Sequence, residues 1–167
     1  MDKQSGIIVL IPAYKPDARM VELVCELRGN GLDVMLVDDG GQAPFAPLFA
    51  QCRELGAEVA VHTVNLGKGR ALKTGINAAL LRWPDLRAIV TADADGQHTP
   101  KDILRLIDAV DEHPDTLVLG SRKFTGNVPF KSRWGNRITR TVYGLASGVH
   151  IYDTQTGLRA LPRCALH

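Results

Sequence analysis

The sequence predicts an α/β fold with a mostly parallel sheet flanked by helices. Short apolar runs alternate along the chain with amphipathic segments of roughly ten to fourteen residues, a pattern typical of βαβ units. Several of these runs end in acidic or glycine-rich turns, which places polar groups at the carboxyl edge of the sheet, where such folds bind ligands. The length of 167 residues is that of a single domain, expected to span residues 1–167.

The first strand is predicted at residues 6–11, a continuous apolar run that indicates burial on both faces. The segment from Pro12 to Pro16 ends it. Asp17 can then cap a helix, because the apolar residues that follow keep helical spacing as far as Gly29. The remaining elements are expected as strands at 33–37, 58–62 and 116–120, helices at 44–55, 70–82 and 136–147, and a helix that begins at Pro162.

The central strand is expected to start at Ala88 and to end in two carboxylates, Asp93 and Asp95. Residues i and i+2 of an extended backbone point the same way, so both carboxylates, and Gln97 after them, would project from one face. Two close carboxylates repel one another unless a cation lies between them, and Mg²⁺ or Mn²⁺ prefers such oxygen ligands. Acids also end strands merely because turns are solvated, so the pair alone leaves both interpretations open. Thr99 is expected to cap the next helix.

Composition narrows the range of functions. A net charge of +2 is too small to indicate nucleic-acid binding, and no such partner is expected. The three cysteines are widely spaced, form no metal-binding pattern and suggest a reducing compartment. No secretory signal and no apolar run long enough to span a bilayer is visible, so any membrane contact would be peripheral. Basic residues gather in the C-terminal third, either as a solvated face or as a surface for phosphates or anionic lipid: Lys123, Lys131, Arg133, Arg137 and Arg140.

Seven short motifs follow one another along the chain. They are Ile11-Pro12-Ala13-Tyr14, Val37-Asp38-Asp39-Gly40, Asn65-Leu66-Gly67-Lys68-Gly69, Asp93-Ala94-Asp95-Gly96-Gln97-His98, Gly120-Ser121-Arg122, Gly135-Asn136 and Asp153-Thr154-Gln155-Thr156-Gly157-Leu158-Arg159. In this order and spacing, the chain from Ile8 to about Ala160 resembles the family 2 glycosyltransferases of GT-A fold, nearest the polyprenyl-phosphate glycosyltransferases. The resemblance implies a Rossmann-like GT-A fold. It also implies a domain truncated at its C-terminus, because such relatives carry further acceptor-side helices.

The resemblance implies a role for each motif. The nucleotide-sugar would be held by Pro12, Tyr14, Val37, Asp39, Lys68, Asp93, Ala94, Asp95 and Gln97, the first four at the base and ribose. Mg²⁺ or Mn²⁺ would be bound by Asp93, Asp95 and Gln97 and would carry the donor's pyrophosphate. The catalytic set would be Asp93, Asp95, Arg122 and Arg133, with the arginines meeting donor or acceptor phosphate. Asp153 and Arg159 would shape the sugar pocket or brace the fold.

The implied activity is metal-dependent, inverting transfer of a hexose from UDP-glucose or GDP-mannose to a polyprenyl-phosphate lipid. It would serve cell-envelope glycan synthesis, in the cytoplasm at the inner face of the membrane. Physical chemistry agrees, because the departing nucleoside diphosphate develops charge that a metal ion and arginines stabilise. The acceptor phosphate is already anionic and needs steering more than deprotonation. The nucleotide base stays open, because many relatives carry Asn-Glu where this chain has Lys15-Pro16, with Asp17 as a potential substitute.

Two other interpretations stay open at this level. The chain could bind a sugar nucleotide without transferring the sugar, if the acceptor side is missing as the resemblance implies. Alternatively, Asp93, Asp95 and Ser121 resemble part of the set that haloacid-dehalogenase-like phosphatases use, in which Asp-x-Asp-x-Thr follows the first strand. Here the acids follow the fourth predicted strand, and Gln97 takes the place of the threonine. A turnover assay with lipid phosphate separates binding from transfer.

Overall fold

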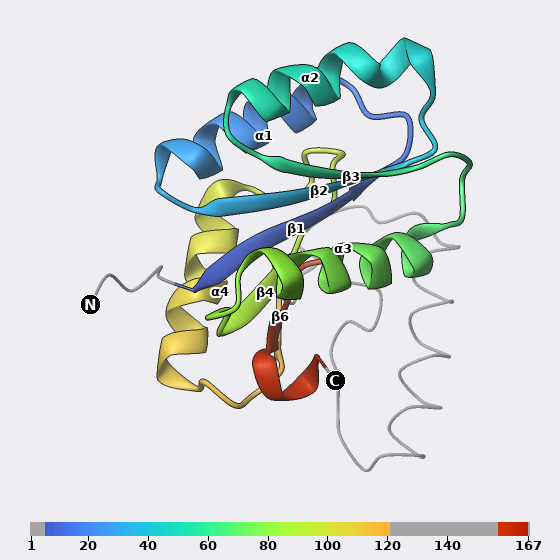
Figure 1. Cartoon of the computed structure of the whole chain (residues 1–167). Helices are drawn as coiled ribbons and strands as arrows, with labels where there is room; N and C mark the ends of the chain where they lie inside the picture. Colours follow the sequence, from blue (N-terminus) through green and yellow to red (C-terminus); the bar gives the residue numbers. More distant parts are fainter. Residues whose placement is uncertain (1–5, 121–156, 167) are drawn as a thin grey trace, which may run out of the picture.

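A computed structural model describes residues 6–120 and 157–166 of the chain. Over these residues it contains a six-stranded sheet with helices on both faces (Figure 1). The strands are β1 (Ile7–Ala13), β2 (Asp33–Asp39), β3 (Glu58–His62), β4 (Ala88–Thr91), β5 (Val118–Leu119) and β6 (Arg159–Pro162). The helices are α1 (Ala18–Gly29), α2 (Ala46–Glu54), α3 (Lys68–Arg82) and α4 (Pro100–Glu112), with short 3-10 helices at Ala43–Phe45 and Arg163–Ala165.

The strands lie in the order β3-β2-β1-β4-β6-β5. β1 pairs in parallel with β2 and with β4, and β2 pairs in parallel with β3. β6 runs antiparallel to both of its neighbours, β4 and β5. The prediction of a mostly parallel sheet flanked by helices is therefore confirmed, and the carboxyl ends of β1, β2 and β4 share one edge.

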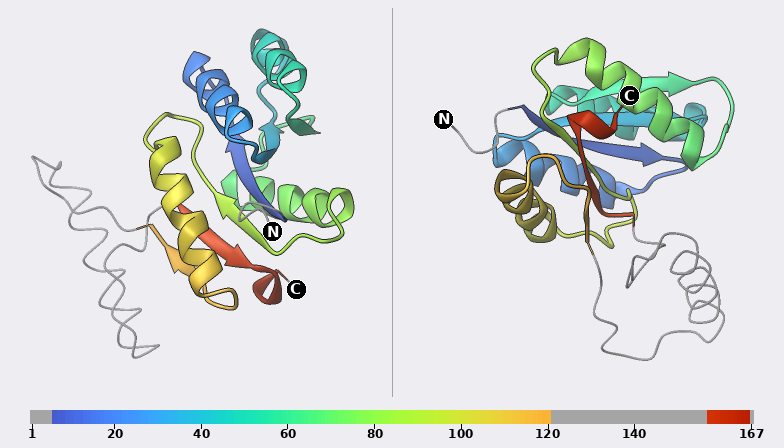
Figure 2. Two further views of the ribbon diagram at one scale, coloured as in Figure 1. Left: turned by 90° about the vertical axis from the view of Figure 1, so that its left-hand side faces the viewer. Right: turned by 90° about the horizontal axis from the view of Figure 1, so that it is seen from below.

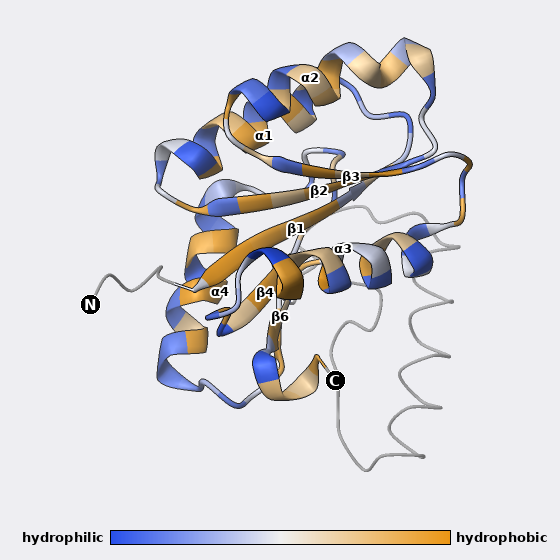
Figure 3. Ribbon diagram, viewed as in Figure 1, coloured by the Kyte–Doolittle hydropathy of each residue, from blue (hydrophilic) through white to orange (hydrophobic). Residues whose placement is uncertain are grey.

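β1 divides the core between the two faces of the sheet. Ile7, Val9 and Ile11 belong to the cluster packed with α1, α2 and α4, whereas Ile8 and Leu10 belong to the cluster packed with α3. Figure 2 shows the helices on the two faces of the sheet. This alternation has the two-residue period of a strand, and burial on both faces explains why the run carries no polar residue. The strands are accordingly apolar along much of their length (Figure 3).

Two predicted helix starts are confirmed. Asp17 caps α1, where its carboxylate accepts a hydrogen bond of 3.0 Å from the backbone N–H of Arg19. Thr99 caps α4, where its hydroxyl oxygen accepts one of 3.2 Å from the N–H of Asp102. Such caps satisfy N–H groups that have no partner inside the helix, so they fix where the two helices leave the site edge of the sheet.

Some predicted boundaries are wrong. The segment 116–120 pairs with β6 only at Val118 and Leu119, so β5 is shorter than the predicted strand. Pro162 ends β6 instead of starting an α-helix, and the N–H of Arg163 after it donates to the Arg87 carbonyl at 2.8 Å. The helix predicted at 136–147 lies outside the described residues. None of the helices described in the structure is long and apolar enough to cross a membrane.

Candidate functional site

A pocket of about 210 Å³ opens at the carboxyl ends of β1 and β4. One wall is the segment that leaves β1 for α1, and the other is the turn that follows β4. The pocket brings together five residues predicted to bind a nucleotide-sugar: Pro12, Tyr14, Asp93, Ala94 and Asp95. Neighbouring parallel strands end at the same edge, and for that reason segments far apart in the sequence meet here.

Asp93 is held from three sides. The ammonium of Lys68, the first residue of α3, lies 2.5 Å from Asp93 Oδ1, and Nε2 of the buried His98 lies 3.6 Å from Oδ2. His98 and Lys68 lower the pKa of Asp93 to about 2, although its partial burial works in the opposite direction. Gly157 lies against the carboxylate, and a Cβ at that position would collide with it. Asp93 is therefore ionised at neutral pH and restricted in position.

Asp95 shares a tight turn with Gln97. Gly96 between them has a φ of +73°, a left-handed conformation that glycine adopts readily. In this turn Asp95 accepts a bond of 3.0 Å from the backbone N–H of Gln97 and one of 2.5 Å from its side-chain Nε2. The expectation of extended backbone through the acid pair is wrong, because β4 already ends at Thr91.

The oxygen donors of this turn fit a hard divalent cation. Asp93 and Asp95 both line the pocket, and Mg²⁺ is commonly held by one or two carboxylates together with water and substrate phosphates. Within residues 6–120 and 157–166, no three or more His, Cys, Asp or Glu side chains gather as a closed protein cage for a metal. The donor set therefore suits Mg²⁺ or Mn²⁺ that carries a phosphate ligand, and does not suit a structural metal.

Asp39, at the end of β2, holds the loop before α3. Its side chain is 4% exposed and accepts hydrogen bonds of 2.9 Å from the backbone N–H groups of Leu66 and Gly67. Nδ1 of His62 lies 2.7 Å from the same carboxylate, and Nε2 of His62 lies 2.8 Å from Thr74 Oγ1 on α3. Burial would raise the pKa of Asp39, but these hydrogen bonds outweigh it and lower that pKa. Asp39, predicted to face the base and ribose, thus also joins β2, β3 and α3.

Other predicted residues are not brought into the pocket. Val37 is fully buried, and its side chain packs with the core on the α3 side of the sheet. Lys68 is not part of the pocket wall and reaches it through Asp93. Arg159 begins β6, where its carbonyl lies 3.5 Å from the hydroxyl of Thr91. Three predicted residues lie outside the described part of the chain: Arg122, Arg133 and Asp153.

Arg19 lines the pocket but does not belong to the predicted site. Its Nε and Nη2 donate to the carboxylate of Asp17 at 2.6–3.1 Å, and its charge is also attracted by Asp95. The hydrogen bonds from Arg19 lower the pKa of Asp17. A guanidinium beside the acid pair is suited to a phosphate-bearing ligand. Sequence reasoning missed it because the approach of α1 to the turn after β4 is a long-range contact, and its place just after a helix cap is a weak signal.

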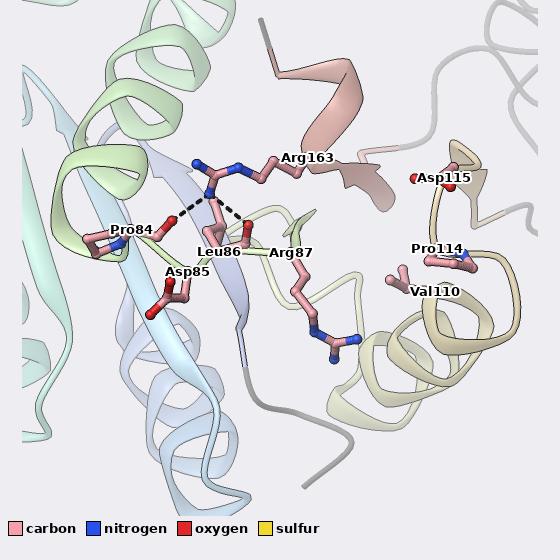
Figure 4. Close-up of a pocket in the computed structure, with 8 residues that line it drawn as sticks. All are labelled: Pro84, Asp85, Leu86, Arg87, Val110, Pro114, Asp115 and Arg163. Atoms are coloured by element: carbon pink, nitrogen blue, oxygen red, sulfur yellow. Dashed lines mark hydrogen bonds between the residues drawn. The ribbon is translucent and has the colours of Figure 1, made fainter. Parts of the chain in front are cut away.

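A second hollow, of about 470 Å³, lies at the opposite edge of the sheet, before β4 (Figure 4). The guanidinium of Arg163 donates to the carbonyls of Pro84 and Leu86 there, at 2.7 and 2.9 Å. Arg87 pairs with Asp111 at 3.2 Å. Both arginines are thus occupied by contacts within the chain itself. No residue of the predicted site lines this hollow. The smaller pocket therefore holds the candidate chemistry.

Comparison with known proteins agrees with the geometry. The chain matches glycosyl transferase family 2 over residues 8–165. It is 34% identical over 159 residues to an uncharacterized protein of Methanocaldococcus jannaschii, and this alignment covers 92% of the present chain and 63% of that protein. It is 30% identical to a UDP-N-acetylglucosamine--dolichyl-phosphate N-acetylglucosaminyltransferase of Methanococcus voltae, over 96% of this chain and 70% of that protein. It is also 30% identical to a polyprenol monophosphomannose synthase of Mycolicibacterium smegmatis, over 93% and 61%.

The structure is similar to the crystal structure of M. tuberculosis glucosyl-3-phosphoglycerate synthase, with a TM-score of 0.60. The alignment covers 95% of this chain and 57% of the other, at 18% sequence identity. A likeness at this identity concerns the fold alone, and it agrees with a GT-A-like α/β architecture. The chain spans 61–70% of the length of the three relatives named above.

Proposed function

The chain belongs to glycosyl transferase family 2, and we propose that it is the donor-binding and catalytic domain of a metal-dependent, inverting hexosyltransferase that uses a polyprenyl-phosphate acceptor. The single observation that carries the proposal is the shared pocket, in which Tyr14 meets the acid pair Asp93 and Asp95. Family membership leaves the phosphatase interpretation of the acid pair without support.

The donor's nucleotide would lie along the β1 side of the pocket. Tyr14 is 48% exposed, so its ring offers a flat surface on which a base can stack. The ammonium of Lys15 lies 5.1 Å from the centre of that ring and brings a positive charge to the same wall. Asp39 would act here mainly by fixing the loop beside the nucleotide, since its oxygens already accept three hydrogen bonds.

The donor's diphosphate would lie at the acid pair. Asp93 and Asp95, with Gln97 as a third proposed ligand, would hold the Mg²⁺ or Mn²⁺ ion, which when bound offsets charge on the departing diphosphate. Arg19 would add a direct charge-assisted contact from the wall of the pocket. Two further arginines, Arg122 and Arg133, are proposed for the donor or acceptor phosphate and lie outside the described residues.

The acceptor we propose is a polyprenyl phosphate, for cell-envelope glycan synthesis. Two relatives support it by their names, one acting on dolichyl phosphate and the other making polyprenol monophosphomannose. A phosphate monoester is anionic near neutral pH, so its oxygen can attack the sugar carbon without a strong base. Direct attack from the side opposite the leaving group inverts that carbon. Contact with the cytoplasmic face of a membrane would be peripheral and would serve to reach the lipid.

A calorimetric titration tests the donor site. UDP-glucose and GDP-mannose are the first and second candidates, and UDP-N-acetylglucosamine is added because one relative's name includes it. Each is titrated with Mn²⁺ and again with EDTA. We expect metal-dependent binding of one nucleotide-sugar, and the absence of binding for all of them would contradict the proposal. A turnover assay with polyprenyl phosphate then distinguishes transfer from binding alone.

Asp95→Ala tests the metal assignment. It should abolish the metal-dependent part of donor binding while leaving the fold intact, because Asp95 bonds only to its own turn in the described contacts. Asp108→Ala is the matched control, since it removes an exposed carboxylate of α4 that does not line the pocket. Unchanged donor affinity in Asp95→Ala would contradict the metal assignment.

A further inference from the structure

We propose that Lys68 is the resident counter-charge of Asp93, that a divalent ion must displace it, and that the freed ammonium then contacts the donor's diphosphate. The inference rests on the proposed function and deepens its metal site. Lys68 would therefore weaken the binding of metal alone and strengthen the binding of metal together with nucleotide.

The contacts of the acid pair support this assignment. Lys68 Nζ lies 2.5 Å from Asp93 Oδ1, on a residue that also lines the donor pocket. Asp95 instead bonds to the uncharged amide of Gln97. Arg19, the guanidinium in the same wall, is tied to Asp17. Among the described lysine and arginine side chains, Lys68 is thus the one that forms an ion pair with a proposed metal ligand, Asp93.

The backbone of Lys68 is held by the loop before it, whereas its side chain is exposed. It is the first residue of α3, and the N–H groups of Leu66 and Gly67 just before it donate to the buried Asp39. The Lys68 side chain is 54% exposed and has a flexible four-carbon stem. The ammonium can therefore leave Asp93 by rotation of the side chain, without a movement of α3.

Electrostatics sets the sign of the effect. An ammonium and a divalent cation that approach the same carboxylate oxygen repel one another, so a metal ion at Asp93 must break the ion pair with Lys68. A diphosphate brought by the metal places anionic oxygens within reach of the released ammonium, which suits phosphate as a compact point charge. The arrangement therefore favours joint binding of metal and nucleotide over binding of either alone.

Mn²⁺ titration followed by electron paramagnetic resonance tests the inference without any activity assay. In the absence of nucleotide, Lys68→Met should bind Mn²⁺ at least about threefold tighter than the wild type, the scale of a partly exposed ion pair. Lys68→Arg keeps the charge and should stay within about twofold of the wild type. Lys73→Met, which removes an exposed lysine further along α3, is the matched control and should show no change.

A second titration measures the nucleoside diphosphate at saturating Mn²⁺. Here Lys68→Met should bind UDP or GDP at least about threefold more weakly than the wild type, opposite in sign to its effect on metal. If Lys68→Met binds Mn²⁺ like the wild type while wild-type nucleotide binding is intact, the inference is overturned and the proposed function stands. If neither protein binds Mn²⁺ even in the presence of the nucleoside diphosphate, both are overturned. Circular dichroism confirms that each variant is folded.

Discussion

Asp39 and Asp93 are both acidic residues at the same edge of the sheet, but they differ in burial and in hydrogen-bond partners, and we expect different roles for them. The Asp39 side chain is 4% exposed and accepts its bonds from fixed backbone and ring N–H groups. Asp93 is 25% exposed and pairs with the ammonium of Lys68, which ends a long and exposed side chain. A carboxylate held by fixed donors stabilises the local fold, whereas one that faces a flexible side chain can exchange its partner.

Asp39→Asn should destabilise the fold by about 2–3 kcal/mol, because an amide replaces one acceptor oxygen with an N–H₂ group that faces existing donors. The backbone N–H of Leu66 or Gly67 would then lose its partner in a buried site. Urea unfolding measures the change, with the exposed Asp108→Asn as control. A loss no larger than that of the control would show that Asp39 is not needed to hold the loop.

Asp93 should make stability depend on pH in a defined acidic window. Its pKa is lowered from 3.8 to about 2, so its contribution is complete above pH 3.8 and is lost as the pH falls towards 2. The stability of the wild type relative to Asp93→Asn should therefore fall by at most about 2 kcal/mol across that window. Urea unfolding in EDTA at pH 6, 4.5 and 3 measures the difference, and parallel behaviour of the two proteins down to pH 3 would contradict the assigned pKa.

At the scale of whole elements, the position of α3 depends on a glycine. A Cβ at Gly75 would collide with Leu10 of β1 and lie 2.9 Å from Val37 Cγ2 of β2. The helix therefore lies closer to the sheet than any side chain at this position would permit. This close approach also sets where Lys68, at the start of α3, stands relative to the acid pair.

Gly75→Ala should destabilise the protein by about 1–3 kcal/mol through overpacking, although alanine has the higher helix propensity. Gly69→Ala is the matched control on the same helix, because nothing lies within 4 Å of its added Cβ. It should be neutral or stabilising by up to about 1 kcal/mol. Thermal unfolding of both variants measures the contrast, and equal effects would mean that α3 is not held tightly against the sheet.

Elements whose evidence lies in their own residues could be predicted from the sequence. The apolar run of β1 and the caps at Asp17 and Thr99 are local signals, and the structure confirms them. β6 could not be predicted, because a short antiparallel strand depends on its partners β4 and β5, and a sequence pattern does not name partners. Pro162 shows the same limit, since a proline suits a helix start and a strand end equally well.

The candidate site was predictable to a similar extent. Tyr14 and the acid pair could be placed at one edge, because parallel strands carry their carboxyl ends to the same side. The burial of Val37 and the approach of Arg19 to Asp95 could not be predicted. Both depend on which helix covers which face, and that is decided by packing across the whole domain.

At the scale of the whole molecule, a segment late in the sequence lies beside the central strand β4. The segment 157–162 lies beside β4, and the hydroxyl of Thr91 donates to the carbonyl of Gly157 at 2.8 Å. This segment contains β6, which lies between β4 and β5 in the sheet and pairs with both. A late part of the sequence therefore lies directly against Asp93, so the position of this proposed metal ligand depends on the completed sheet.

Gly157→Ala tests this dependence. The atoms nearest to the added Cβ all belong to the Asp93 side chain, and Gly157 does not have a positive φ, so the carboxylate must turn away while the backbone stays relaxed. Displacement of a ligand by about 1 Å is enough to expect at least about a tenfold loss of metal-dependent nucleotide binding. Stability should fall by no more than about 2 kcal/mol, the most that the contacts of the Asp93 carboxylate with Lys68 and His98 contribute, because the core itself need not repack. Gly29→Ala, with nothing within 4 Å of its Cβ, should leave binding unchanged. Mn²⁺ and nucleotide titrations of the two variants decide the matter, since equal affinities would mean that Asp93 does not depend on the returning segment for its position.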